Sequence, residues 1–373
     1  MLQQFIVNSN EINQGLSIIS HAIAARPVKN IYSGISIETI DEGLLLTATD
    51  GEMTIKKIVN AQVAVPGSTV FPAKLFTEVM RKQSIGDIRV NVDDNNTARI
   101  LSSGSKTSIM GMSDDDFPQI KDITSGQKVK IVSSAFKNAI NRVMFAVSTD
   151  EARKTLTGIL MEIYPKEVRL VSIDGFRLAL ISIEAENQVP DGREFVSCII
   201  PGRVMNELSK IIPDDDTEIE LIYNASHVMV SFKGVRLYTT LLQGEFIDYK
   251  AILPQSAQTE MEIERTRFYD ALERCSLIAR EGKSNLITMD ISENGLSMSA
   301  RAERGDAHED IPMVFHGNPL KISFNSQYMM DVVRNVEDDQ MRMCFQSSVS
   351  PCIVRPLEGG KFVFLVLPVR TFD

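Results

Sequence analysis

The hydrophobic pattern of this chain occurs three times along its length. Apolar residues spaced by four, three and four positions occupy residues 12–23, then 136–147, then 268–279, at intervals of 124 and 132 residues. The first set is Ile12, Leu16, Ile19 and Ile23. Spacing of this kind places side chains on one face of an α-helix, so each set predicts a helix that buries an apolar stripe.

A second helix is predicted in each copy, with a strand before it. Residues 70–83, 199–212 and 323–336 have similar apolar spacing. Their predicted inner faces are Leu75, Phe76 and Val79, then Val204, Met205 and Leu208, then Tyr328, Met329 and Val332. Alternating apolar and polar positions, typical of half-buried strands, precede these helices at residues 44–48, 168–172 and 296–300.

A repeat of this length is a whole domain rather than one unit of a solenoid. The 373 residues are therefore expected to form three similar domains, at 1–126, 127–256 and 257–373. Two helices against mainly antiparallel strands predict an α+β domain with the helices on one face of the sheet. The expected helix caps are Ser9 or Asn10, Ser134 and Thr266, and Gly359-Gly360 is expected to form a turn in the last hairpin.

Composition adds few constraints. Apolar residues make up 43% of the chain and charged residues 24%, as in ordinary globular proteins. No transmembrane run and no signal peptide are visible in the sequence. The four cysteines lie far apart without metal-binding spacing, so reduced thiols in a cytoplasmic protein are expected.

The distribution of charge is more informative than the net charge of −10. The predicted helical segments have a balance of +8, and the rest of the chain has a balance of −18. These segments are 9–29, 72–83, 133–155, 201–211, 265–284 and 325–336. If the helices of three domains lie on one side, that side becomes a positive surface suited to phosphate groups. Solvated helix charge is the alternative interpretation.

The sequence offers little for catalysis. Its four histidines are isolated, and the GKS at 282–284 lacks the first glycine of a phosphate-binding loop because that position is Leu277. Ser134 and Lys137 match a short acyl-serine pattern without its companion motifs. The aspartate runs at 114–116 and 214–216 favour solvated turns over a metal site. We therefore expect a protein that is not an enzyme and that has no cofactor or metal.

Several short motifs, in register over the whole chain, resemble the bacterial DNA polymerase III beta subunit, the sliding clamp family. The central signature consists of LTGILMEI at 156–163 and SIDGFRLAL at 172–180. The other matching segments are Arg26-Pro27, TDGEM at 49–53, VFPAKLF at 70–76, DFP at 116–118, GEFIDYKAILP at 244–254 and FLVLPVR at 364–370.

This resemblance implies a specific function. Clamps of this family are head-to-tail homodimers whose domains close a ring around duplex DNA, with helices inside and sheets outside. They tether DNA polymerase III alpha and other polymerases to the template, and a clamp-loader complex opens the ring. Partners dock through short peptides in a hydrophobic pocket between the second and third domains. The resemblance also implies that the protein is located in the bacterial cytoplasm, is associated with the nucleoid and has no membrane partner.

The resemblance also implies site residues. The pocket positions are Leu156, Ile173, Gly175, Phe176, Arg177, Leu178, Ile247, Ile252, Val349, Pro351, Leu365, Leu367, Pro368, Val369 and Arg370. The candidate DNA-facing residues are Arg26, Lys74, Lys82, Arg203 and Lys283. The implied dimer interface comprises Lys106, Thr107, Ile109, Leu277, Ile278 and Glu303. Ordinary core packing is the alternative for each apolar pocket residue taken alone.

The chain departs from the family pattern at several of these positions. Phe176 stands where the family often has histidine, and Ile247 replaces a common proline. Asp150 replaces a neutral DNA-contacting side chain, and Thr107 is smaller than the aromatic residue of some relatives. The tail continues past the usual end with residues 371–373. Peptide preference and dimer strength are therefore expected to differ from those of other members.

Two alternatives belong to other classes. The first is an adaptor with the clamp fold that retains the pocket but no longer encircles DNA; a monomer in solution would favour it. The second is a metal-dependent hydrolase that uses the aspartate runs at 114–116 and 214–216, for which divalent metal binding is the deciding observation.

Overall fold

The computed structural model describes residues 2–24, 29–120, 122–190, 192–254, 256–282 and 285–370. These residues form two compact units, each of which combines two segments of the chain. Unit 1 comprises Met1–Ser134 and Glu207–Leu241, and unit 2 comprises Ala135–Asn206 and Leu242–Asp373. The predicted division into three domains stays a prediction.

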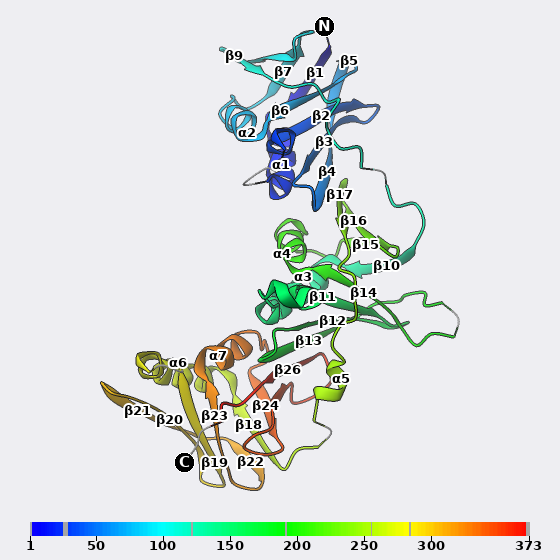
Figure 1. Ribbon diagram of the computed structural model, residues 1–373. Coiled ribbons are helices and arrows are strands. Elements are labelled where there is room, and N and C mark those ends of the chain that lie inside the picture. The colour runs from blue at the N-terminus through cyan, green and yellow to red at the C-terminus, as the bar shows by residue number, and fades with distance from the viewer. Residues whose placement is uncertain are drawn as a thin grey trace. The chain divides into compact units, whose positions relative to one another are not determined.

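Two antiparallel sheets form the framework of unit 1 (Figure 1). The first sheet has the strand order β5 (Ala61–Val65), β1 (Gln3–Asn8), β7 (Asp87–Val92), β8 (Thr97–Ser102) and β9 (Ser105–Met110). The second has the order β10 (Gln127–Val132), β15 (Glu218–Tyr223), β16 (His227–Phe232), β17 (Val235–Thr240), β4 (Met53–Val59), β3 (Gly43–Thr49), β2 (Gly34–Ile40) and β6 (Ser68–Pro72). Strands from distant parts of the chain therefore meet where β17 pairs with β4.

Helix α1 (Ser9–Ile19) packs on β3 and β4 and contacts α2 (Ala73–Arg81). Its predicted stripe residues Ile12, Leu16 and Ile19 are fully buried. Two 3-10 helices, at Ser20–Ala22 and Asn30–Ser33, follow α1. Burial of these apolar side chains is the main favourable contribution to docking the helix.

Unit 2 also contains two antiparallel sheets (Figure 1). The larger has the order β14 (Val196–Pro201), β11 (Gly158–Ile163), β12 (Glu167–Ile173), β13 (Arg177–Glu184), β26 (Phe362–Val366), β25 (Cys352–Arg355), β24 (Gln340–Phe345), β18 (Thr259–Glu264) and β22 (Val314–Gly317). The smaller has the order β21 (Gly305–Ile311), β20 (Gly295–Ala302), β19 (Leu286–Ser292) and β23 (Leu320–Asn325). Here β13 pairs with β26, so residues far apart in sequence again share one sheet.

Helix α6 (Arg265–Glu281) packs on β19, β20 and β21, and α7 (Ser326–Arg334) packs on β23 and β26. The short helix α5 (Tyr249–Ile252) lies in the segment that follows β17. Helices α3 (Ser133–Val143) and α4 (Gly202–Ile211) each contain residues of both units. Two further 3-10 helices are formed by Met144–Ala146 and Glu151–Thr157.

The α+β class and the predicted stripes are confirmed, with corrections at the helix ends. Ile23 and Val147 lie just after 3-10 helices, in extended backbone. The fourth member of each of these two predicted stripes is therefore not helical. Leu75 was placed on the inner face of its helix, but its side chain is 49% exposed. The inner face of α2 is formed by Phe76, whose ring stacks on that of Phe71 in β6 at a centroid distance of 4.8 Å.

The predicted helix caps are wrong. Helix α1 is capped by Asn8, whose side chain accepts a hydrogen bond from the N–H of Asn10. Ser134 lies within the first turn of α3, and its N–H donates to the carbonyl of Asp215. Helix α6 begins at Arg265, one residue before Thr266, and its preceding residue Glu264 forms no capping side-chain hydrogen bond. Sequence spacing locates helices better than it locates their first residues.

Three other observations bear on the sequence predictions. All four cysteines are free thiols, and burial raises the pKa of Cys198 to about 12. Gly359 has a φ of +78°, which is consistent with the predicted turn. Among the described helices, none has the length and hydropathy required to span a membrane.

Candidate functional site

Six of the predicted pocket residues lie in one apolar cluster of unit 2. Strands β12, β13 and β26 and the 3-10 helix Glu151–Thr157 contribute to this cluster. Its buried members include Leu156, Ile173, Leu178 and Leu365, and the partly buried Ile252 and Leu367 pack against it. The structure thus brings together residues from three distant segments, as predicted. The four buried members support the site from beneath rather than forming its accessible surface.

Three large apolar side chains among the predicted pocket residues are exposed. Phe176 is 53% exposed, Ile247 is 41% exposed and Val349 is 57% exposed. Pro351, Pro368 and Val369 are partly exposed, and Arg370 is exposed. Burying such side chains against a partner would release water from apolar surface. These residues, rather than the buried leucines, are the ones positioned to contact a ligand.

A tight turn between β12 and β13 positions Phe176. Asp174 Oδ1 accepts hydrogen bonds from the N–H groups of Phe176, at 2.8 Å, and Arg177, at 2.9 Å. Gly175 has a φ of +97°, a conformation that side-chain-bearing residues rarely adopt. A Cβ atom at Gly175 would also lie 2.8 Å from Arg153 Nη1. The backbone conformation therefore requires the glycine, whereas the Arg153 guanidinium is the end of a flexible side chain and could shift.

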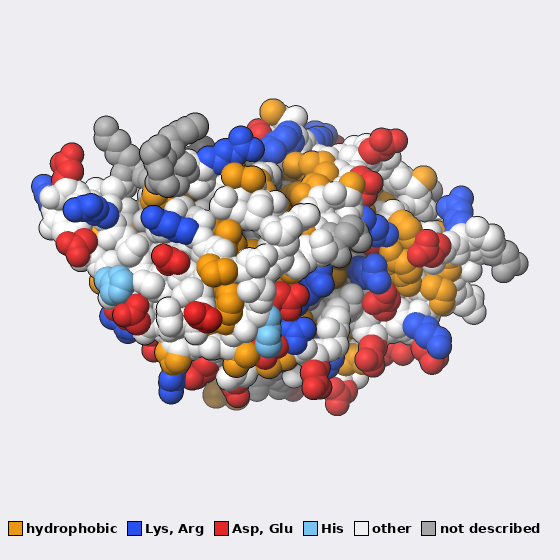
Figure 2. All heavy atoms as spheres, turned by 90° about the horizontal axis from the view of Figure 1, so that it is seen from below, with side chains coloured by type: hydrophobic (Ala, Val, Ile, Leu, Met, Phe, Trp, Pro, Cys, Tyr) orange, Lys and Arg blue, Asp and Glu red, His pale blue; other side chains and the backbone are white. Residues whose placement is uncertain are grey.

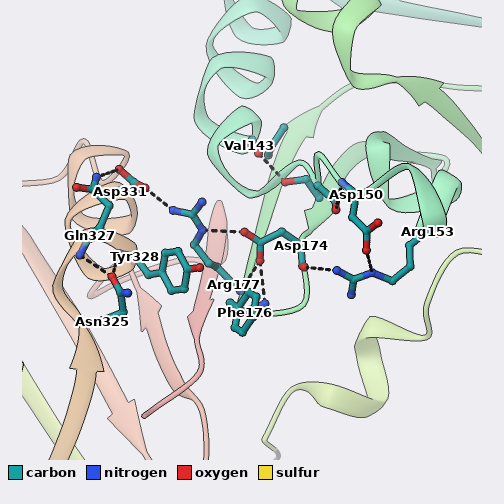
Figure 3. Close-up of polar contacts among 12 residues, drawn as sticks. Val143, Asp150, Arg153, Asp174, Phe176, Arg177, Asn325, Gln327, Tyr328 and Asp331 are labelled. Carbon is teal, nitrogen blue, oxygen red and sulfur yellow. Dashed lines mark hydrogen bonds and ion pairs between the residues drawn. The ribbon is translucent and has the colours of Figure 1, made fainter. Parts of the chain in front are cut away.

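Arg177 joins this turn to helix α7 (Figure 3). Its Nε donates to Asp174 Oδ2 at 3.0 Å, and its Nη1 donates to Asp331 Oδ2. Gln327 Nε2 donates to the other oxygen of Asp331 at 2.9 Å. Charge-assisted hydrogen bonds of this kind are among the stronger polar contacts in proteins. The resemblance implies that Arg177 is a pocket residue, but its side chain is only 13% exposed and holds two elements together.

Tyr328 lies between Arg177 and Phe176. The Arg177 guanidinium is 4.5 Å from the centre of the Tyr328 ring, and the Phe176 ring stacks on Tyr328 at 5.5 Å with an interplanar angle of 29°. Asn325 Oδ1 accepts the N–H groups of Gln327 and Tyr328 and so caps α7. The exposed Phe176 ring is thus held against a tyrosine that the arginine fixes in place.

A second polar group lies on the other side of the turn. Asp150 accepts hydrogen bonds from the N–H of Ala152 and from Arg153 Nε, each at 3.0 Å. These contacts lower the pKa of Asp150 below its ordinary value, with the backbone hydrogen bond as the larger cause. Arg153 Nη2 also donates to the carbonyl of Asp174 at 3.1 Å. Asp150 therefore caps and orders the segment beside the turn.

The segment that contains Ile247 is attached to the larger sheet of unit 2 by a buried carboxylate. Glu162 is 3% exposed and accepts hydrogen bonds from the hydroxyls of Tyr249, at 2.7 Å, and Tyr164, at 3.1 Å. Burial, followed by this contact with Glu162, raises the pKa of Tyr249 above its ordinary range. Lys250 Nζ lies 3.6 Å from Glu162 and 4.6 Å from the ring centre of Phe195. This cluster fixes the backbone beside Ile247.

The predicted DNA-facing residues are exposed where the structure describes them. Lys74, Lys82 and Arg203 are exposed on or beside α2 and α4, whereas Arg26 and Lys283 lie outside the described residues. Three cations on helices form side-chain contacts within unit 2: Arg142 with Glu337, Arg274 with Glu309 and Arg334 with Tyr269. On the face that Figure 2 shows, acidic and basic side chains lie interspersed with small hydrophobic patches.

The predicted dimer residues lie on strand β9, on helix α6 and, for Glu303, in the turn between β20 and β21. Strand β9 is the last strand of one sheet of unit 1, and β21 is the last strand of one sheet of unit 2. Leu277 is 60% exposed, and Lys106 and Glu303 are exposed. Ile109 is only 3% exposed, so it packs within its own sheet, while its neighbour Met110 is 75% exposed. On β21, Glu309 Oε2 accepts a hydrogen bond from Arg274 Nη2 at 2.6 Å.

The aspartate runs show no grouping typical of a metal centre. Among the described residues, no three His, Cys, Asp or Glu side chains lie together as potential metal ligands. Asp215 contacts Lys233 Nζ at 2.5 Å, and this contact lowers the pKa of Asp215 to about 2. Its side chain also accepts the N–H of Thr217, as a turn aspartate does.

The sequence prediction missed three polar residues that organise the pocket: Asp174, Tyr328 and Asp331. Tyr328 was noted only as a member of the inner face of its helix. The aspartates are adjacent to recognised positions, but nothing in their spacing indicates that Arg177 links them. The one available signal was the Asp-Gly pair before Phe176, which is typical of a tight turn.

Models of a single protein family match nearly the whole chain. The N-terminal domain of the DNA polymerase III beta subunit matches residues 3–121, its central domain matches 130–248, and its C-terminal domain matches 250–370. These three matches occur in the order in which the family arranges them.

Similar proteins share the full length of the chain. The beta sliding clamp of Staphylococcus aureus (strain Mu50 / ATCC 700699) is 28% identical, with 100% of both chains covered. The crystal structure of the DNA polymerase sliding clamp from Bacillus subtilis is 27% identical, with a TM-score of 0.95 and 100% of both chains covered. A putative DNA polymerase III beta subunit from Eubacterium rectale is 26% identical, with a TM-score of 0.94, and covers 99% of this chain and 100% of its own. The chain therefore belongs to the DNA polymerase III beta subunit family.

Proposed function

We propose that this protein is a DNA sliding clamp that closes head to tail with a second copy around duplex DNA and tethers polymerases to it. The observation that supports this most strongly is the match of all three family domains over residues 3–370. As a member of this family, the protein is a non-catalytic subunit rather than an enzyme. It acts by keeping other proteins on DNA.

Sequence-independent contacts with phosphate groups suit this function. Lys74, Lys82 and Arg203 are exposed, and we assign them, with Arg26 and Lys283, to the DNA-facing surface. A protein with a net charge of −10 is a poor DNA binder by affinity alone. A closed ring does not require high affinity, because its topology retains the DNA. Weak contacts would also permit sliding along the duplex.

Pairing of two copies would join the edges of two sheets. Strands β9 and β21 each end a sheet, and exposed edge strands readily pair with another chain. We assign Lys106, Thr107, Ile109, Leu277, Ile278 and Glu303 to this interface or to its immediate support. Leu277 on α6 and Met110 on β9 supply exposed apolar area for it.

Partner proteins would dock through short extended peptides on the surface formed by Phe176, Ile247 and Val349. The partners expected from the family are DNA polymerase III alpha, other polymerases, the clamp-loader complex and further proteins with similar peptides. Leu367, which packs on the apolar cluster, donates its N–H to the carbonyl of Phe176 and so links the cluster to this surface. Exposed aromatic and aliphatic anchors over a packed base are typical of peptide-binding sites.

Two further assignments follow from the same proposal. The chain divides into three clamp domains at 1–126, 127–256 and 257–373, so that two copies supply six domains to the ring. The protein acts in the bacterial cytoplasm in association with the nucleoid, where its DNA partner resides.

The test is retention on circular DNA. After loading by a clamp-loader complex onto nicked circular duplex, the protein should stay bound through gel filtration at moderate salt, and it should be lost when the circle is linearised. Equal retention on circular and linear DNA would contradict topological binding. Equal loss from both would leave the chain without a clamp function.

A further inference from the structure

Unit 1 contains a cavity away from every site assigned above. Its volume is about 510 Å³, within the range of about 300–1,000 Å³ typical of ligand pockets. It lies where β3 and β4 meet β17, and Pro118, Gln119, Ile120 and Ile123 form one wall. The lining residues used below are Tyr32, Gly51, Ile120, Ile123, Thr239 and Thr240.

The turn at this cavity has the same geometry as the turn that presents Phe176. Asp50 Oδ1 accepts the N–H groups of Glu52, at 2.9 Å, and Met53, at 2.8 Å. Asp174 makes the equivalent two contacts in unit 2, at 2.8 Å and 2.9 Å. Gly51 has a φ of +96° and Gly175 a φ of +97°. The internal repeat therefore contains the same aspartate–glycine turn twice.

The strand pairing beside each turn is also equivalent. Met53 pairs with Thr239 across β4 and β17, as Arg177 pairs with Val366 across β13 and β26. One position further along, Thr54 pairs with Tyr238, where unit 2 pairs Leu178 with Leu365. The same strand pairing thus occurs in both units, but Thr54 and Tyr238 at this cavity stand where unit 2 has Leu178 and Leu365.

The wall formed by residues 118–120 and Ile123 is held to the sheet by polar contacts of Ile120 and Asp122. Asp122 accepts hydrogen bonds from the Tyr238 hydroxyl and, at 2.6 Å, from Arg236 Nη1. Lys56 Nζ donates to the carbonyl of Ile120 at 2.6 Å. Burial, followed by the contact with Asp122, raises the pKa of Tyr238 above its ordinary range, so this hydroxyl stays protonated. The cavity is thus preformed, which lowers the entropic cost of binding.

The interior of the cavity is lined by isoleucine and tyrosine side chains on one part and by the buried threonines Thr49, Thr54 and Thr239 on another, and its rim is polar. Ile120 and Ile123 pack on the cluster of Ile222, Met229 and Tyr238, and both remain partly accessible, as does Tyr32. Gln119, His227 and Thr240 are exposed at the rim. Among the described lining residues, Glu52 is the one acidic residue, and none is Lys or Arg. This lining fits an aromatic side chain flanked by polar, non-acidic neighbours.

We propose that this cavity is a second peptide-binding site, which accepts an extended segment of a partner protein with one aromatic anchor between polar and basic residues. The argument from the repeat rests on the proposed function of the Phe176 surface, whereas the cavity and its lining are independent of it. The aromatic ring enters between Tyr32 and the two isoleucines. The end of β17 at Thr239 and Thr240, together with Gln119, contacts the flanking peptide.

The test uses the full chain with isotope-labelled isoleucine methyl groups. The probe is the capped peptide Ser-Lys-Phe-Ser-Ser, with matched peptides in which phenylalanine is replaced by alanine or lysine by glutamate. Binding in the millimolar range is expected to shift the Ile120 and Ile123 signals saturably. The alanine peptide should bind at least tenfold more weakly, and the glutamate peptide severalfold more weakly.

Matched variants locate the binding. Thr240→Trp places a large ring at the exposed rim and should abolish the shifts, whereas Asn95→Trp, at an exposed turn of the same unit, should leave them unchanged. Absence of saturable shifts at Ile120 and Ile123, or shifts that persist in Thr240→Trp, would overturn the proposal. The dependence on phenylalanine provides a second criterion that needs no variant of the protein.

Failure of this inference is separable from failure of the proposed function. Retention on circular DNA together with unperturbed Ile120 and Ile123 signals would remove the second site and leave the clamp intact. Loss of retention with saturable, phenylalanine-dependent shifts would leave the cavity as a peptide site on a protein of another function.

Discussion

Arg177 and Asp331 join the turn before β13 to the middle of α7. The arginine side chain is 13% exposed and the aspartate 22%, so the pair is largely removed from water. The same guanidinium lies 4.5 Å over the Tyr328 ring, which in turn supports Phe176. One ion pair therefore controls the position of an aromatic surface that belongs to two elements.

Replacing Asp331 with alanine should lower the free energy of unfolding. The change leaves Arg177 with one carboxylate partner, Asp174, and removes the acceptor of Gln327. We expect a loss of about 1–3 kcal/mol in the free energy of unfolding. Urea denaturation measures the loss, with Glu358→Ala, an exposed position of the same unit, as the control. A change no larger than that of the control would contradict the role given to this pair.

Phe176→Ala and Leu178→Ala should separate ligand contact from core support. Phe176 is 53% exposed, so its truncation should weaken a partner peptide by about 1–3 kcal/mol with little effect on stability. Leu178 is fully buried, so its truncation should lower stability by about 2–5 kcal/mol through the cavity it leaves. Calorimetric titration with a polymerase-derived peptide and urea denaturation measure the two effects. Equal peptide affinity in Phe176→Ala and the unchanged protein would place the peptide elsewhere.

Periodicity predicted the fold well because it reflects burial. Phe136, Ile140 and Val143 are fully buried as their spacing requires. Helix ends were predicted less well, since a cap depends on one side chain and one backbone angle, as at Asn8. Leu75 was misplaced because a short helix allows more than one assignment of its buried face.

The site was predictable only in part. The resemblance placed Phe176, Ile247 and Leu367 near one another, and the structure confirms that Leu367 packs on the same cluster as Leu178. The contacts of Arg177 with Asp174 and Asp331 join residues 154 positions apart in the second case. Nothing in local spacing encodes such a contact, because it arises from the pairing of β13 with β26.

Alkaline pH should destabilise unit 2 through Tyr249. This tyrosine is 3% exposed and donates to Glu162, and its pKa is raised in the folded protein above the ordinary value of about 10. The stabilising effect is complete below pH about 10 and declines above it, because the unfolded chain then releases a proton that the folded chain retains. Each further pH unit should cost up to about 1.4 kcal/mol from this group. Midpoints of urea unfolding measured from pH 8 to 11 should fall less steeply in Tyr249→Phe, and parallel curves for the two proteins would contradict this linkage.

Leu277→Asp should convert a pair of chains into single chains. Leu277 is 60% exposed on α6 beside the edge strand β21, and a charge buried in an interface without a partner costs several kcal/mol. The unchanged protein should have a mass near twice 41.5 kDa at low micromolar concentration, and the variant a mass near 41.5 kDa. Light scattering coupled to gel filtration measures both, and Ile85→Asp, at a position that is 89% exposed in unit 1, is the matched control. A single-chain mass for the unchanged protein would favour an adaptor that does not encircle DNA, and Thr107 on β9 would then be the first position to replace with an aromatic residue.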